Sequence, residues 1–136
     1  MYAEYNDSLI TGNDMIDTQH RELVDRMNKL IESCDENNSK SVAIKTLDFL
    51  SDYMNFHFSA EEHLQKEIAY PEYDRHKAEH TLFKRTINEL EQLLEDEDGL
   101  SGEFTSRVQE QVVEWFYSHV KHFDKPFAAY AFTREK

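Results

Sequence analysis

The chain has 136 residues, of which 39% are hydrophobic and 12% aromatic, and its formal net charge is −13. This charge argues against nucleic acid or an anionic membrane surface as a partner, because a phosphate-binding face needs clustered Lys and Arg. The length predicts one domain, residues 1–136, and the small number of glycines (three) and prolines (two) favours an all-α protein with short connections.

The first 13 residues lack helical periodicity and are predicted to form an arm. Three of its side chains would pack against the rest of the chain: Tyr5, Leu9 and Ile10. After the arm, apolar residues recur at steps of three and four, which predicts a helix capped by Asn13 or Asp14. Its inward stripe contains Ile16, His20, Leu23, Val24, Met27, Leu30, Ile31 and Cys34.

A polar cluster at residues 37–39 is predicted to end this helix, and Ser39 or Ser41 to cap the second. The inward face of the second helix would carry Ala43, Leu47, Leu50, Met54, His57, Glu61, Leu64 and Gln65. Pro71 lacks a backbone N–H, so it is predicted to mark a turn and enter the first turn of a third helix. That helix would turn inward Tyr73, His76, His80, Phe83, Ile87, Leu90 and Leu94.

The acidic residues 95–98, with Gly99 and Gly102, are predicted to form a solvated loop. A fourth helix would begin near Glu103 and turn inward Phe104, Val108, Val112, Trp115, Phe116, His119, Val120 and Phe123. Residues 127–132, after Pro126, are predicted to add one or two final helical turns. Together the elements predict an antiparallel up-down-up-down four-helix bundle with an N-terminal arm and a short C-terminal helical segment.

Two pairs of metal-competent side chains are spaced four residues apart, His57 with Glu61 and His76 with His80, which places each pair on one helix face. Three more inward polar side chains join them: His20, His119 and Asp124. A single histidine on an apolar stripe is more often an ordinary core residue. Five inward histidines spread over four helices need another explanation, because each buried polar group without a partner costs roughly 1 to 3 kcal/mol. A metal centre would remove this penalty.

The seven donors exceed what one metal ion uses, since zinc takes four ligands and an octahedral ion six. Two octahedral ions offer twelve positions. Five imidazoles, two bridging carboxylates and a bridging oxide or hydroxide fill eleven of them. The remaining position on a redox metal is where dioxygen would bind.

The order and spacing of these residues resemble the hemerythrin family, specifically its single-domain bacterial members. The resemblance spans nearly the whole chain and is carried by Ile16-Asp17-Thr18-Gln19-His20, His57-Phe58-Ser59-Ala60-Glu61-Glu62, Tyr70-Pro71, His76-Lys77-Ala78-Glu79-His80, and His119 with Asp124-Lys125. It implies one hemerythrin-like domain with two iron ions, Fe²⁺ or Fe³⁺, joined by an oxo or hydroxo bridge. It also assigns the ligands: to the saturated iron His76, His80 and His119, to the iron with the open position His20 and His57, and to the bridges Glu61 and Asp124.

The resemblance implies reversible dioxygen binding, as a carrier, store or supplier, rather than an enzyme. One alternative is an oxygen or redox sensor that works with a separate partner. Another is a di-iron peroxidase, oxidase or nitric oxide scavenger, and weak activity of that kind is compatible with oxygen binding. Anions such as azide are expected as further ligands, and the sequence does not indicate an oligomeric state.

The oxygen pocket is expected to be lined by Phe58, Gln65, Trp115, Phe116 and Val120. Phe116 stands where the family often has leucine, and Gln65 where it usually has methionine. A buried amide needs hydrogen-bond partners, so Gln65 would hold a water, contact the bound ligand or turn to solvent. We hypothesise that Gln65 makes the pocket more polar and either speeds autoxidation or admits anions such as azide.

The remaining histidines, His63 and His122, are expected to face water. Glu62 and Glu79 lie beside predicted ligands in the sequence but off the inward stripe, and are predicted to be solvated. Cys34 is predicted to be a small buried apolar residue.

The single cysteine excludes an intramolecular disulfide and suits a reducing compartment. No apolar run approaches the ~20 residues of a membrane span, and the polar residues 1–7 do not resemble a signal peptide. A soluble cytoplasmic protein without a membrane partner is therefore predicted.

Overall fold

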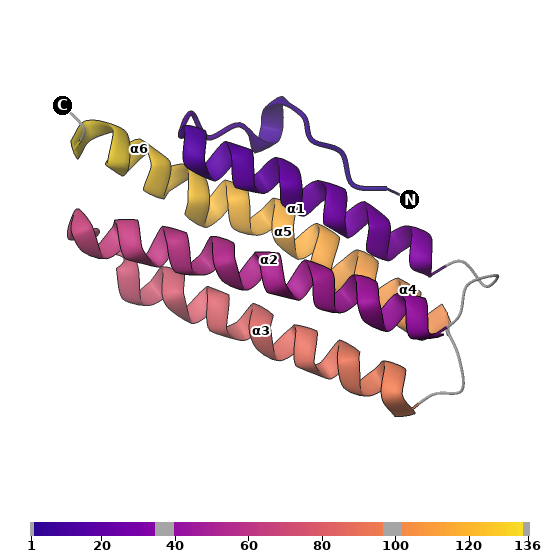
Figure 1. Cartoon of the computed structure of the whole chain (residues 1–136). Helices are drawn as coiled ribbons and strands as arrows, with labels where there is room; N and C mark the ends of the chain where they lie inside the picture. Colours follow the sequence, from indigo (N-terminus) through magenta and orange to yellow (C-terminus); the bar gives the residue numbers. More distant parts are fainter. Residues whose placement is uncertain (1, 35–39, 97–101, 135–136) are drawn as a thin grey trace.

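The computed structural model describes residues 2–34, 40–96 and 102–134. Its long helices are α1 (Asp14–Ser33), α2 (Lys40–Glu67), α3 (Tyr73–Asp96) and a fourth helical stretch from Gly102 to Arg134. The four lie side by side with alternating chain direction, and the part of the chain that is described contains no strand (Figure 1). The predicted all-α four-helix bundle is confirmed.

The fourth helical stretch combines α-helical and π-helical turns. Its α-helical parts are α4 (Gly102–Val108), α5 (Trp115–His119) and α6 (Lys125–Arg134), and the π-helical turns between them are η2 (Gln109–Glu114) and η3 (Val120–Asp124). The predicted short C-terminal segment is therefore a direct continuation of this helix. The wide turn η3 lies just before Pro126, where a regular α-helix would bring the proline ring against a preceding carbonyl.

The start of α1 follows the predicted capping chemistry. Asn13 is the cap, and its Oδ1 accepts a hydrogen bond of 3.0 Å from the backbone N–H of Ile16. The carboxylate of Asp17 accepts from the backbone N–H groups of Thr11 (2.9 Å) and Gly12 (3.1 Å). Gly12 has a φ of +89°, which glycine adopts readily. These bonds fix where the arm joins the bundle.

The arm packs on the bundle through a different set of residues from the predicted one. Leu9, in the short 3-10 helix η1 (Asp7–Leu9), is buried, and Tyr5 packs against the core while partly exposed. Ile10 is 46% exposed, so its predicted packing is wrong. Ala3 is buried instead, and its backbone N–H and C=O both bond the side-chain amide of Asn28.

Several predicted helix ends shift by a few residues. Pro71 lies in the turn before α3 rather than in its first turn, and Ala69 has a φ of 54° in the same connection. Ser41 lies inside α2. The first two residues of the predicted acidic loop, 95–96, complete the last turn of α3. The predicted polar cluster at 37–39, the Ser39 cap and the rest of that loop through residue 101 fall outside the described residues, whereas Gly102 begins α4.

The core is divided into two apolar clusters. The larger one includes Met27, Leu30, Leu47, Leu50, Leu90, Leu94, Phe104 and Val108. The smaller one contains Ile16, Phe127, Ala128 and Ala131. Among the described helices, none combines the length and apolar character needed to span a bilayer.

Candidate metal centre

The seven predicted donors come from all four helices of the bundle. Each side chain is between 0 and 2% exposed, so the whole set is shielded from water. α1 contributes His20, α2 contributes His57 and Glu61, α3 contributes His76 and His80, and the fourth helical stretch contributes His119 and Asp124.

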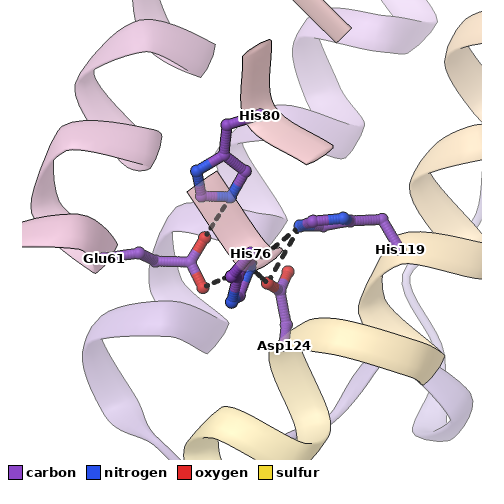
Figure 2. A group of neighbouring side chains, drawn as sticks. All are labelled: Glu61, His76, His80, His119 and Asp124. Atoms are coloured by element: carbon purple, nitrogen blue, oxygen red, sulfur yellow. Dashed lines mark hydrogen bonds and ion pairs between the residues drawn. The ribbon is translucent and has the colours of Figure 1, made fainter. Parts of the chain in front are cut away.

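Five of the donors form one group, Glu61, His76, His80, His119 and Asp124, in which one donor atom from each lies within 4.8 Å of all the others. Figure 2 shows these five side chains pointing toward one another from three helices. Oδ1 of Asp124 lies 3.0 Å from Nε2 of His76 and 3.2 Å from Nε2 of His119. Oε1 of Glu61 lies 3.5 Å from Nε2 of His80.

A second group consists of His20, His57 and, again, Asp124. Oδ2 of Asp124 lies 2.9 Å from Nε2 of His20, so its two oxygens face different groups. Glu61 also reaches both groups, because its Oε1 is 3.0 Å from Nε2 of His57 and its Oε2 is 4.0 Å from Nε2 of His76. The two carboxylates thus lie between one group with three imidazoles and one with two.

The donor atoms at this position lack the partners that buried polar atoms require. Within the described ranges, the following buried atoms make no hydrogen bond: Nε2 of His20, His57 and His80, both oxygens of Glu61, and Oδ2 of Asp124. Several lie close together, but without hydrogen-bond geometry. Leaving them unsatisfied costs roughly 1 to 3 kcal/mol each. Nitrogen and carboxylate donors that converge in this way fit metal cations.

The electrostatics of the site also favour cations. Burial raises the pKa of Asp124, but the neighbouring His119, His20 and His76 outweigh it and hold the pKa well below its usual range. Burial and Asp124 raise the pKa of Glu61, yet His57 and His80 bring it below the usual value. Burial lowers the pKa of His119, but Asp124 raises it to about 10. Two ionised carboxylates in a dry core attract positive charge, and a metal ion competes with protons for these donors.

The outer ring nitrogens of three histidines have hydrogen-bond partners. Nδ1 of His57 lies 2.6 Å from Oε1 of Gln19, and Nδ1 of His80 lies 2.8 Å from Oε2 of Glu62. Nδ1 of His76 lies 2.7 Å from Nε2 of Gln65. Partners of this kind orient an imidazole and decide which nitrogen carries its proton.

The predicted solvation of Glu62 is therefore wrong. Its side chain is 17% exposed, and although burial raises its pKa, the hydrogen bond from His80 and nearby charges bring the pKa below its usual value. Glu79 is also only 28% exposed, and its Oε1 lies 4.0 Å from Nδ1 of His119. Both carboxylates sit next to a donor in the sequence but reach a histidine on a neighbouring helix. Helical periodicity within one element does not reveal such a contact.

Gln65 does not turn to solvent, which was one of the three contacts predicted for it, because its side chain is fully buried. Its amide lies against the outer nitrogen of His76, which belongs to the three-imidazole group. Gln19, which was not singled out as a candidate, is 7% exposed. Its position immediately before His20 gave no signal of its bond to a residue of another helix.

The other predicted pocket residues surround the site with apolar surface. Phe58 stacks on His80 with a centroid distance of 3.8 Å, and Trp115 on His119 at 4.5 Å. Phe116 presents its edge to His20 at 5.1 Å, and Val120 is fully buried in the larger apolar cluster. Phe116 thus lies against the two-imidazole group, and Phe58 lies near both groups, since its ring centroid is 6.0 Å from that of His57.

The two histidines that were not predicted as donors, His63 and His122, are both exposed. Nε2 of His63 lies 2.9 Å from Oε1 of Glu67 on the surface of α2. Both face solvent, as predicted.

Comparison with known proteins identifies a family. Residues 11–131 match the description "Hemerythrin HHE cation binding domain". The chain is 27% identical to a bacteriohemerythrin from Stenotrophomonas maltophilia (strain R551-3), over 91% of this chain and 78% of that protein. It is 29% identical to the bacteriohemerythrin of Methylococcus capsulatus, over 85% of each.

Solved structures show the same similarity. A wild-type hemerythrin crystal structure superposes with a TM-score of 0.79 at 26% identity, covering 93% of this chain and 95% of that one. A hemerythrin mutant with a leucine replaced by tyrosine gives the same TM-score and identity, with 93% and 94% coverage.

Proposed function

Because this chain belongs to the hemerythrin family, which binds oxygen at a di-iron centre, we propose that it binds dioxygen reversibly, as a carrier, store or supplier. The observation that carries the proposal is the pair of buried donor groups that share Asp124. One group offers three imidazoles and the other two, so their capacities for metal differ. Such an asymmetric pair suits one saturated ion and one with a free position.

In this proposal each donor has a defined role. His76, His80 and His119 would hold one iron, and His20 and His57 would hold the other. Glu61 and Asp124 would be shared between the two, which is supported by the way their oxygens face both groups. When bound, the two irons supply the reversible electron transfer that oxygen binding requires.

The surrounding residues keep the site dry and the imidazoles oriented. Gln19 and Glu62 bond the outer nitrogens of His57 and His80 and hold those rings in place. Phe116 fills the space beside His20 and limits the entry of water and of anions such as azide. Exclusion of water favours release of dioxygen as such over its loss in reduced form. These features support binding rather than turnover.

A polar oxygen pocket around Gln65 would promote oxidation of the irons and so favour an enzyme over a carrier. Its amide faces the outer nitrogen of His76, on the group with three imidazoles. That contact adds no support to a peroxidase, oxidase or nitric oxide scavenger, and oxygen binding stays the function that we propose.

The test is anaerobic loading with Fe²⁺ followed by metal analysis and absorption spectra. We expect two irons per chain, a colour that develops in air and a return to the colourless form under vacuum. The variant His20→Ala should lose the oxygen response, whereas His122→Ala, at an exposed position, should behave as wild type. One zinc per chain, or irreversible oxidation with turnover of peroxide, would overturn the proposal.

A further inference from the structure

The side chain of Gln65 is fully buried, yet only one end of its amide has a partner. Its Nε2 lies 2.7 Å from Nδ1 of His76, and within the described part of the chain its Oε1 makes no hydrogen bond. A buried amide that makes one bond out of a possible four calls for an explanation.

The two ends of an amide have nearly the same size and shape, so a half-turn of the Gln65 side-chain amide exchanges them in place. When Nε2 of His76 binds a metal ion, the ring proton sits on Nδ1, and only Oε1 of Gln65 can accept it. When Nε2 carries the proton, as its 3.0 Å contact with Oδ1 of Asp124 allows, Nδ1 becomes an acceptor and only the amide N–H can donate.

The partner of His80 offers a comparison on the same helix pair. Glu62 lies 2.8 Å from Nδ1 of His80, and an ionised carboxylate can only accept a hydrogen bond. It therefore matches one tautomer, the one with the proton on Nδ1. The Gln65 amide can match both tautomers of His76, and it adds no negative charge to the buried site.

We propose that Gln65 is a positioning residue for His76, whose amide bonds Nδ1 in both tautomers by turning over when a metal ion is bound or lost. The inference rests on the proposed role of His76 as a ligand. It gives a physical reason for an amide at this position, because methionine has no strong donor or acceptor to offer the ring.

The test uses Zn²⁺ as a diamagnetic probe and compares Gln65→Met, which removes the bond, with Gln65→Glu, which keeps only an acceptor. We expect Gln65→Met to bind Zn²⁺ about tenfold more weakly in competition with a chromophoric chelator. Gln65→Glu should stay close to wild type in the Zn²⁺-loaded protein. Gln92→Met, on the surface of α3, is the matched control and should change nothing.

Nitrogen-15 spectra of the His76 ring supply a second readout. They should change if Gln65 bonds the ring, but not if Gln65 only fills space beside it. In wild type we expect the proton on Nε2 without metal and on Nδ1 with Zn²⁺. In Gln65→Glu the metal-free ring should lose the neutral Nε2–H form. Wild-type affinity and unchanged ring signals in Gln65→Met, or a ring proton on Nδ1 in both wild-type states, would overturn the inference.

These outcomes are independent of oxygen chemistry. If wild type binds Zn²⁺ through His76 but the iron-loaded protein does not bind oxygen reversibly, the proposed function fails and the role of Gln65 stands. If Gln65→Met does not fold, the tautomer of the His76 ring in metal-free Gln65→Glu still tests the inference.

Discussion

The two donor groups differ most clearly in the residues that face their outer nitrogens. His80 and His119 have carboxylates nearby, Glu62 at 2.8 Å and Glu79 at 4.0 Å. His57 has the neutral amide of Gln19 at 2.6 Å. A carboxylate partner raises the basicity of an imidazole ligand more than an amide does. Two rings of the group with three imidazoles therefore have a carboxylate near the outer nitrogen, while its third ring, His76, has a neutral amide, as His57 has in the other group.

Substitution of Phe116 tests whether this side chain controls access to the site beside His20. Replacing it with leucine leaves extra space there, so we expect faster autoxidation and tighter azide binding in the iron-loaded protein. Phe104→Leu is the matched control, because Phe104 is equally buried (1% exposed) in α4. Each variant should lose about 1 to 2 kcal/mol of stability. Equal autoxidation rates in the two variants would show that Phe116 does not guard the site.

Cys34 is the one thiol of the chain, and it is half-buried rather than fully buried as predicted. Burial raises its pKa, and its Sγ lies 3.3 Å from the backbone carbonyl oxygen of Leu30. The thiolate is the reactive form, so a raised pKa leaves less of it at neutral pH. We expect slow labelling by iodoacetamide at pH 7.5 that accelerates as pH rises and when the chain is unfolded. Labelling as fast in the folded as in the unfolded chain would contradict this.

At the scale of a single element, the π-helical turn η3 accounts for the spacing of two donors. On a regular α-helix, residues five apart point about 140° away from each other. In a turn closed by i→i+5 hydrogen bonds they share a face, and the N–H of Lys125 does bond the C=O of Val120. Asp124 is therefore fully buried beside His119, while Phe123, predicted inward from the four-residue step, is only half-buried.

This geometry predicts opposite outcomes for two changes in η3. Deleting the exposed Lys121 would convert the turn to a regular α-helix in which His119 and Asp124, now four apart, still share a face. Inserting one alanine after Lys121 would turn them apart. We expect the deletion to retain two metal ions per chain and the insertion to lose metal, with similar helix content by circular dichroism. Loss of metal in both would show that η3 has another purpose.

The sequence was sufficient for the parts of the fold that depend on local periodicity. Steps of three and four predicted the inward faces of α1, α2 and α3, and the side-chain chemistry of Asn13 predicted a cap. The π-helical turns were not predicted. The residues of η2 have no distinct pattern, and the sign of η3 was the five-residue spacing of His119 and Asp124, which were both expected to face inward. The bonds of Gln19, Glu62 and Gln65 were missed because each joins two helices. The periodicity of one helix does not show how that helix is rotated relative to its neighbour.

At the scale of the whole molecule, the donors form a polar layer next to two apolar clusters. His20 lies one turn from Ile16 of the smaller cluster, and His57 one turn from Met54 of the larger one. The larger cluster continues to the far end of the bundle through Leu90, Leu94 and Phe104. The two halves of the bundle are therefore stabilised in different ways. The half that contains Leu90, Leu94 and Phe104 depends on apolar burial, and the half that contains the donors depends on satisfying buried polar groups.

Removal of metal should reveal this division. Ligands stabilise the folded state by mass action, by about 2.7 kcal/mol at a concentration one hundred times Kd, so chelation should lower the melting temperature. Hydrogen exchange should then rise mainly in peptides around His20, Glu61, His76 and Asp124, which lose their shared partner. Peptides around Leu47 and Leu90 should keep most of their protection, because their packing does not involve the donors. The variant His122→Ala should show the same pattern as wild type. A uniform loss of protection along all four helices would mean that the two halves unfold together, and that the metal centre supports the bundle as a whole.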